Sequence, residues 1–351
     1  MKIPNNLKIG DTIGICAPSA GISKEEKQIK LDAAIKHLKE IGFNVIETES
    51  VRKDEMGRSA SGEVRTKEFM ELYTNPNVSA IIFAAGGDFL LEMIEYIDFD
   101  EIKKYPVKWM AGYSDITGIS FMMTSILDIP TLYTQTIKDY AMKPLHKSLE
   151  DAIKIMMGEN VLQESFDKCE KAVDMNSFIE EINSDEVKEI NPEEGYNLEE
   201  DVVWKNLYDE EYIEIKGRAL GGCLDVLKNI FGTKFDNINS YIDKYKDDGI
   251  VWFFDLFETN TPEIVRTMWQ MKNAGYFRNC KGILVGRALF LREEYDIDIK
   301  EAFKQGLKGL EIPVIYDMDI GHVSPQMPII NGGKIEVKSS NGKGILLSYL
   351  D

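Results

Sequence analysis

Short apolar runs and amphipathic stretches of helical length alternate along the chain up to about residue 130. This alternation predicts an α/β domain of the Rossmann- or flavodoxin-like type, in which a parallel sheet is flanked by helices on both faces. Ligands bind beyond the carboxyl ends of the strands in such sheets. We expect strands at residues 12–17, 43–48, 78–84 and 107–111, and helices at residues 24–41, 64–73, 90–97 and 119–127.

The alternation stops after about residue 158. Residues 163–201 are rich in Glu, Asp, Asn and Lys, which indicates a linker or surface insert. Short strands with intervening turns follow, and Asn341-Gly342 is a typical hairpin turn. We expect strands at residues 212–217, 250–255, 282–285, 314–315, 334–338 and 344–349, and helices at residues 220–230 and 262–274. The predicted parts are an α/β domain (1–160), an acidic linker or insert (161–205) and a strand-rich α+β domain (206–351).

Composition excludes several classes of function. The formal net charge of −19 disfavours binding to nucleic acid or to an anionic membrane surface. No apolar stretch approaches the ~20 residues of a membrane span, and the first residues lack the pattern of a signal peptide. The four cysteines lie far apart, with neither a metal-ligand spacing nor a disulfide framework. We therefore expect a cytoplasmic protein with reduced thiols and no metal.

A serine stands where a predicted strand turns into a predicted helix. The strand at 107–111 ends at Gly112-Tyr113-Ser114-Asp115, and the helical pattern starts immediately afterwards. A tight strand-to-helix turn exposes the serine Oγ and places backbone N–H groups of the helix start beside it. Ser114 is therefore a candidate nucleophile, although a helix-capping serine would give the same pattern.

Two glycines follow the neighbouring strand. Residues 80–85 form a buried-type apolar run that ends at Gly86-Gly87. Because parallel strands end at the same edge of a sheet, these glycines are expected near Ser114. A backbone N–H of Gly86 or Gly87, together with that of Asp115, would then form an oxyanion hole.

A serine nucleophile usually needs a histidine and a carboxylate. Of three histidines, His322 follows Gly321 in a loop that leaves an apolar strand, which places it best to act as the base. The strand at 250–255 ends at Asp255, and Glu258 follows it closely. A carboxylate at the end of an apolar strand is costly unless paired, and an imidazole N–H would pair it. Asp255 is the candidate acid, with Glu258 as the alternative.

These residues resemble the serine LD-carboxypeptidases and the related microcin C self-immunity peptidases over nearly the whole chain. Some positions differ from the usual family pattern: Ala85 replaces an Arg, Cys223 an Asn, and the segment starting at Tyr133 a Gly-Pro. The resemblance rests on Ala17-Pro18-Ser19, Arg58-Ser59-Ala60-Ser61 with Arg65, Gly86-Gly87, residues 112–117, residues 217–222, residues 255–266 and Gly321-His322.

The resemblance implies a Ser–His–Glu triad in an active site between the two domains, without a metal or cofactor. Carried over to this chain, Ser114 is the nucleophile, His322 the base and Asp255 the acid. Because Asp is one methylene shorter than Glu, the backbone or the histidine loop must sit closer. The resemblance also implies a homodimer. Arg266 or Arg58 is a candidate for binding a substrate carboxylate, because a guanidinium makes bidentate contacts.

The resemblance implies an amide bond in murein tetrapeptides or related small peptide conjugates as the substrate. Peptidyl or aminoacyl sulfamoyl adenylates are the alternative, and the long acidic insert favours that branch. A non-catalytic protein that binds a small ligand is a further reading. A nucleotide-dependent dehydrogenase is disfavoured, because no G-x-G-x-x-G follows the first strand.

Overall fold

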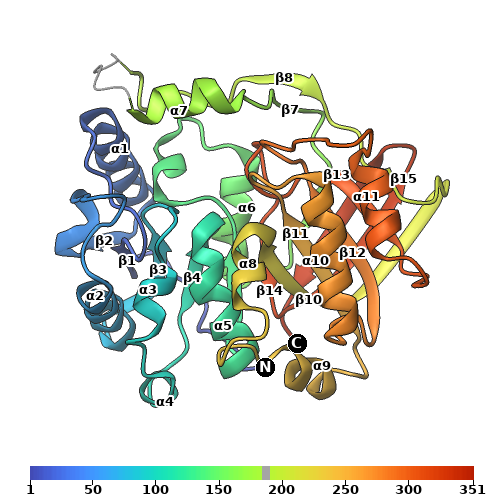
Figure 1. The fold of residues 1–351 in the computed structure, drawn as a ribbon. Helices are drawn as coiled ribbons and strands as arrows, with labels where there is room; N and C mark the ends of the chain where they lie inside the picture. Colours follow the sequence, from blue (N-terminus) through green and yellow to red (C-terminus); the bar gives the residue numbers. More distant parts are fainter. Residues whose placement is uncertain (184–189) are drawn as a thin grey trace. The chain divides into compact units, whose positions relative to one another are not determined.

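The computed structural model describes residues 1–183 and 190–351, which belong to two compact units. The first unit holds Met1–Asn160 and the described part of Asp185–Gly195. The second unit holds the described part of Val161–Ser184 and Tyr196–Asp351. Each unit has a sheet of its own and is described by itself (Figure 1).

The strands of the first unit form the predicted parallel sheet. They are apolar and, apart from the edge strand β2, largely buried, and each neighbouring pair runs parallel. Their order is β5-β4-β3-β1-β2. The strands are β1 (Thr12–Cys16), β2 (Asn44–Glu47), β3 (Val78–Phe83), β4 (Trp109–Gly112) and β5 (Thr131–Tyr133).

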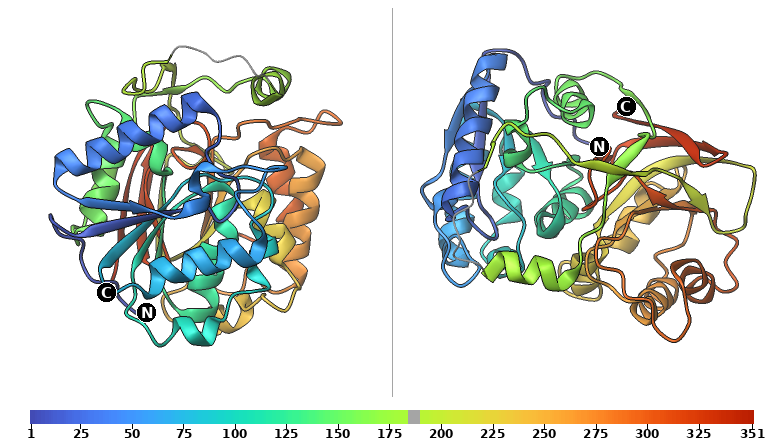
Figure 2. Two further views of the ribbon diagram at one scale, coloured as in Figure 1. Left: turned by 90° about the vertical axis from the view of Figure 1, so that its left-hand side faces the viewer. Right: turned by 90° about the horizontal axis from the view of Figure 1, so that it is seen from above.

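The helices of this unit cover both faces of the sheet, as predicted. The chain moves from β1 to β2 in one direction and from β2 to β3 in the other. Since both crossovers are right-handed, α1 and α2 lie on opposite faces (Figure 2). The helix expected at 90–97 is a single turn. The helices are α1 (Glu25–Ile41), α2 (Gly62–Thr74), α3 (Leu91–Ile94), α4 (Phe99–Ile102), α5 (Thr117–Leu127) and α6 (Lys147–Met156), with 3-10 turns η1 (Glu49–Arg52), η2 (Ser114–Ile116) and η3 (Ile137–Ala141).

The direction of the crossovers reverses at β1. Crossovers leave β1 and β3 toward opposite sides, and ligands of such sheets commonly bind at the carboxyl ends of the strands at this switch point. The segment 17–19 follows β1, Gly86-Gly87 follows β3, and Ser114 follows β4. The fold therefore brings the predicted nucleophile and the glycine pair to one edge.

The second unit is strand-rich, as predicted. Its eight-stranded sheet has the order β6-β16-β15-β10-β11-β12-β13-β9, in which β10 to β13 are parallel and the flanking pairs antiparallel. Asn341 and Gly342 both have positive φ in the turn between β15 and β16. The strands of the sheet are β6 (Leu162–Glu164), β9 (Lys205–Asn206), β10 (Tyr212–Cys223), β11 (Ile250–Asp255), β12 (Cys280–Gly286), β13 (Val314–Met318), β15 (Lys334–Ser340) and β16 (Lys343–Tyr349). The short strand β14 (Ile329–Asn331) precedes β15 in the chain and is not part of this sheet.

Helices cover this second sheet, and α10 and α11 lie in front of β11 to β13 in Figure 1. The helix predicted at 220–230 is wrong in its first four residues. These continue β10, because they pair in register with Trp252 to Asp255 of β11. A Cβ at Gly221 would overlap the Phe253 carbonyl oxygen, so this position needs glycine. The helices are α7 (Met175–Asn183), α8 (Leu224–Ile230), α9 (Ile238–Lys244), α10 (Thr261–Asn273) and α11 (Ile299–Gly306).

The segment 161–205, predicted to be an acidic linker or insert, contains regular elements. β6 and β9 lie at the two edges of the second sheet, whereas β7 (Lys168–Glu170) and β8 (Leu198–Asp201) pair only with each other. Residues 184–189 of this segment lie outside the described part. The parts of the segment that belong to the second unit thus form both edges of its sheet, while β7 and β8 form a two-stranded sheet.

Candidate active site

Ser114 lies in a strained turn. It follows β4 directly, opens η2 and has a φ of 65°, in the left-handed region that residues with a Cβ disfavour. Strained backbone of this kind is concentrated at functional sites. The side chain is partly exposed, and α5 follows η2 without a break. This is the strand-to-helix turn that the sequence predicts for a nucleophile.

Gly86 borders the Ser114 side chain. A Cβ at Gly86 would lie 2.9 Å from both Cβ and Oγ of Ser114, and 3.5 Å from the Asp115 backbone nitrogen. Gly87 has a φ of 147°, and a Cβ there would overlap Ser19 Oγ. The missing side chains therefore leave backbone next to the serine hydroxyl, as an oxyanion hole requires.

The Asp115 carboxylate joins the loops that follow β1, β3 and β4. Its Oδ2 accepts hydrogen bonds from Ser19 Oγ at 2.5 Å and from the Leu90 backbone N–H at 2.9 Å. Burial raises the pKa of Asp115 to about 6, although these hydrogen bonds oppose the shift. Asp115 thus fixes the position of the glycine pair relative to Ser114 through its side chain, a role that the sequence did not reveal.

A buried arginine holds the same loops from the other side. Arg65, on α2, donates from Nη1 to the carbonyl oxygens of Pro18 at 2.8 Å and Phe89 at 3.0 Å. Its Nη2 pairs with Glu92 at 2.8 Å. The side chains of Arg65 and Asp115 therefore both join the loop after β1 to residues that follow the glycine pair.

Tyr133 contacts the nucleophile turn from β5. The Ser114 backbone N–H donates to its hydroxyl at 3.4 Å, and its ring meets that of Tyr113 edge-on. The sequence marked Tyr133 only as a departure from the family pattern. The short apolar run 129–133 was the available signal for a fifth strand, and it would have placed Tyr133 at the same sheet edge.

In the second unit, Asp255 and His322 lie side by side. His322 Nδ1 is 2.8 Å from Asp255 Oδ2, and the Asp255 carboxylate is fully buried. The His322 backbone N–H also donates to Asp255 Oδ1 at 3.2 Å. Gly321 has a φ of 91°, and a Cβ there would overlap Asp255 Oδ1. The histidine loop thus approaches the short aspartate closely, as expected for Asp in place of Glu.

Aromatic rings border this pair. The Phe257 ring lies 4.6 Å from the His322 ring, centroid to centroid. Phe290 contacts Phe257, and Phe178, on α7, contacts both. We call Phe178, Phe257 and Phe290 the aromatic cluster. It limits the orientations of the imidazole on one side.

The other predicted site residues lie apart from these contacts. Glu258 is exposed after β11, and within residues 1–183 and 190–351 the carboxylate at ion-pair distance from His322 is that of Asp255. Arg266 is exposed on α10. Arg58 stacks on Phe89 and pairs with Glu92, so its guanidinium is already engaged.

The structure therefore shows two groups of candidate residues, one in each unit. The candidate nucleophile Ser114 lies with Asp115, Gly86 and Gly87 in the first unit. The candidate acid Asp255 and the candidate base His322 lie together in the second unit. In the described part of the chain, no group of three or more His, Cys, Asp or Glu residues is arranged to hold a metal ion.

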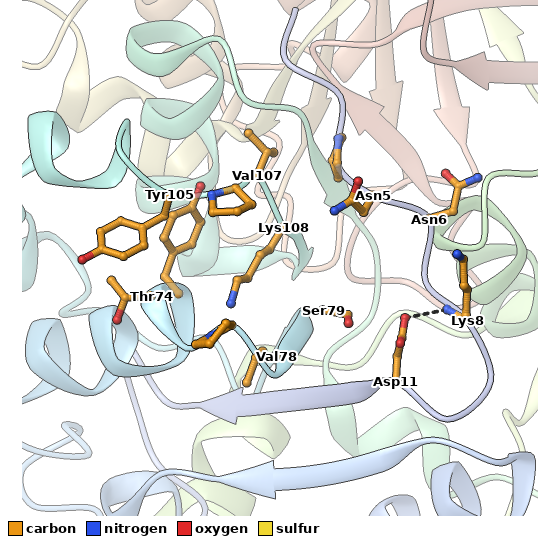
Figure 3. Close-up of a pocket in the computed structure, with 14 residues that line it drawn as sticks. Asn5, Asn6, Lys8, Asp11, Thr74, Val78, Ser79, Tyr105, Val107 and Lys108 are labelled. Carbon is orange, nitrogen blue, oxygen red and sulfur yellow. Dashed lines mark hydrogen bonds between the residues drawn. The ribbon is translucent and has the colours of Figure 1, made fainter.

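A cavity of about 990 Å³ in the first unit lies at the wrong edge of the sheet for this chemistry (Figure 3). Val78 and Ser79, which begin β3, line it, as does Lys108 just before β4. Lys108 Nζ donates to the carbonyl oxygens of Leu72 and Asn75 at the end of α2. The cavity thus opens at the amino ends of the strands, whereas Ser114 stands at their carboxyl ends.

Comparison with known proteins assigns both units to one family. The model of the LD-carboxypeptidase N-terminal domain matches residues 13–134, and that of the C-terminal domain matches residues 216–337. The microcin C7 self-immunity protein of Escherichia coli is 25% identical over 95% of this chain and 92% of its own length. A probable murein peptide carboxypeptidase of Bacillus subtilis is 24% identical over 98% of this chain and 93% of its own.

Solved structures show the same fold. The wild-type apo form of the microcin C7 self-immunity protein superposes with a TM-score of 0.79 at 23% identity, with full coverage of both chains. The muramoyltetrapeptide carboxypeptidase of Oxalobacter formigenes has a TM-score of 0.71 at 20% identity, covering 97% of this chain and all of its own. The two domain matches together span more than half of the sequence. The chain therefore belongs to the LD-carboxypeptidase family and is a hydrolase of the serine peptidase class.

Proposed function

We propose that this enzyme hydrolyses an amide bond in murein tetrapeptides or related small peptide conjugates, through an acyl-enzyme on Ser114. The observation that carries the proposal is the left-handed turn at Ser114, with Gly86 backbone directly beside its hydroxyl. The relatives named as carboxypeptidases of murein peptides support this substrate class.

In the proposed reaction, His322 takes the proton from Ser114 Oγ as the oxygen attacks the substrate carbonyl. Asp255 orients His322 through Nδ1, which leaves Nε2 for the proton. The N–H groups of Asp115 and of Gly86 or Gly87 hold the oxyanion. His322 then protonates the leaving amine, and water releases the acyl group by the same steps.

Two further assignments complete the proposed site. Glu258 is the alternative acid, but its exposure makes it the weaker candidate. The exposed Arg266 would contact a substrate carboxylate. In this scheme a domain spanning 1–160 supplies the nucleophile, a domain spanning 206–351 supplies the acid and the histidine, and 161–205 is an insert between them.

Turnover of a murein tetrapeptide, followed by mass spectrometry, tests the substrate class. We expect release of the terminal D-amino acid by the wild-type enzyme and none by Ser114→Ala. Labelling of Ser114 by a fluorophosphonate, lost in the same variant, separates catalysis from simple ligand binding. An unlabelled wild-type protein would favour a non-catalytic relative.

A second candidate function is hydrolysis of peptidyl or aminoacyl sulfamoyl adenylates. One structure of the microcin C7 self-immunity protein holds aspartyl sulfamoyl adenosine. The aromatic cluster beside His322 favours this alternative, because aromatic rings offer stacking surfaces to a base. The same assay with aspartyl sulfamoyl adenosine compares the two: faster turnover of this compound than of the tetrapeptide would select the second function.

We further propose a cytoplasmic homodimer. In the described part of the chain, no helix combines the length and the apolarity needed to cross a membrane. The four cysteines all lie within the described residues and form no disulfide there, which suits a reducing compartment. Light scattering of the purified protein tests the assembly, since a mass near 80 kDa, twice the 39.9 kDa chain, is expected.

A further inference from the structure

The loop that carries His322 is held by one arginine. Arg287 directly follows β12. Its Nη1 donates to Asp319 Oδ1 at 2.6 Å, and its Nη2 donates to the carbonyl oxygens of Val323 at 3.0 Å and Pro325 at 2.9 Å. One guanidinium therefore forms hydrogen bonds with the loop at residues both before and after His322.

The partner carboxylate is anchored in turn. Asp319 is fully buried, and its Oδ2 accepts hydrogen bonds from Trp204 Nε1 at 2.8 Å and from the Phe166 backbone N–H at 3.4 Å. Burial raises the pKa of the Asp319 carboxyl, and the Arg287 charge opposes this shift. Phe166 and Trp204 both belong to the segment 161–205, so this segment is linked to the histidine loop through Asp319.

A buried arginine can also serve stability alone, and this unit contains such a case. Arg218, on β10, pairs with Asp248 at 2.6 Å and donates to the Gly332 carbonyl oxygen at 2.7 Å. Arg218 pairs in register with Ile250, the first residue of β11, whereas Asp255 is the last residue of that strand. Arg218 thus resembles Arg287 in binding a carboxylate and a backbone carbonyl oxygen, but it lies at the end of β11 opposite Asp255.

We propose that Arg287 is a positioning residue for catalysis, which holds the 319–325 loop so that the His322 imidazole stays aligned on Asp255. This inference rests on the proposed role of His322 as the base. A lysine at 287 keeps the charge beside Asp319, but a single ammonium cannot reach Asp319, Val323 and Pro325 with the geometry of a planar fork. In the Arg287→Lys variant, the His322 imidazole is therefore free to leave the orientation in which it is aligned on Asp255.

The test compares Arg287→Lys and Arg287→Ala with the matched control Arg218→Lys. We expect Ser114 of Arg287→Lys to be phosphonylated by a fluorophosphonate, with loss of fluoride, about 10²-fold more slowly, because a small misplacement of a catalytic group has an effect of this size. For peptide turnover by Arg287→Lys, we expect kcat to fall while KM stays nearly unchanged. Arg218→Lys reacts like the wild type, and added methylguanidine restores part of the rate of Arg287→Ala.

A spectroscopic readout separates this inference from the proposed function. The chain has three histidines, so ¹⁵N-histidine NMR spectra are simple, and His322→Gln assigns the signal of interest. We expect the His322 signals to shift or split in Arg287→Lys and to stay unchanged in Arg218→Lys. If the wild type does not label but these signals move, the proposed function fails and the positioning role stands. A folded Arg287→Lys protein with wild-type labelling rate and unchanged His322 signals would overturn the inference.

Discussion

Gly86 offers the most direct test of the oxyanion assignment at the scale of single residues. In Gly86→Ala the new Cβ would meet Ser114 Cβ and Oγ at 2.9 Å and crowd the Asp115 N–H. We expect kcat to fall by about 10²–10³-fold, as on loss of one oxyanion donor, with little change in melting temperature. Gly195→Ala is the control, because a Cβ there meets nothing within 4 Å. Equal activity of the two variants would refute the assignment.

Asp115 gives a pH dependence with a defined sign. Its folded-state pKa of about 6 lies above the ordinary 3.8, because burial disfavours the charged carboxylate. The stabilisation from its protonation is therefore complete below about pH 3.8 and is lost as the pH rises through about 6. Compared with Asp115→Asn, the wild type should gain on the order of 2–3 kcal/mol in free energy of unfolding between pH 7 and pH 4. Urea denaturation of both proteins at each pH measures this difference in free energy of unfolding. The difference would not change between pH 7 and pH 4 if the pKa of Asp115 were the ordinary one.

At the scale of elements, the β15–β16 hairpin depends on its two-residue turn. Gly342 has a φ of 78°, and a Cβ there would also lie 2.9 Å from Val203 Cγ1. Gly342→Ala should lower the free energy of unfolding by about 1–2 kcal/mol, the usual cost of a left-handed alanine. Glycine at position 341 also adopts the left-handed backbone region, so Asn341→Gly should change the free energy of unfolding by less than about 0.5 kcal/mol. Urea unfolding of the two variants provides the comparison, and a neutral Gly342→Ala would contradict it.

Elements with a clear local signal could be predicted from the sequence. The buried strands β3 and β4, the helix α1 and the hairpin turn lie where periodicity and turn residues placed them, and Ser114 and Gly86 followed from the strand ends. The end of β10 could not be predicted, because two of the four residues 220–223 are glycines, so this stretch shows no side-chain periodicity. Pairing with β11 decides between strand and helix.

Contacts between distant residues left no local signal. Asp115 and Ser19 are 96 positions apart, and the loop contacts of Arg287 span more than 30. Such networks depend on the three-dimensional meeting of loops, and a single sequence does not encode which loops meet. The positions of the proposed catalytic residues at strand ends were thus predictable, while the side chains that hold the loops after those strands were not.

At the scale of the whole molecule, the proposed triad draws on both units. Ser114 belongs to the first and His322 to the second. When two residues act in the same chemical step, removing one of them also removes the contribution of the other. Ser114→Ala and His322→Gln should therefore each lower kcat by about 10⁴-fold or more. The double variant should be no slower than either single variant, within error, in tetrapeptide turnover. Multiplied losses in the double variant would show that the two residues act independently.

The backbone of Ser114 has a consequence for how this protein responds to selection. Its φ of 65° suits glycine better than serine. Ser114→Gly should therefore raise the melting temperature while abolishing turnover, with a gain of about 1 kcal/mol in free energy of unfolding. A directed-evolution screen that selects for heat resistance alone would therefore favour replacement of Ser114 by glycine, with loss of activity. The serine is retained only where the screen also selects for activity.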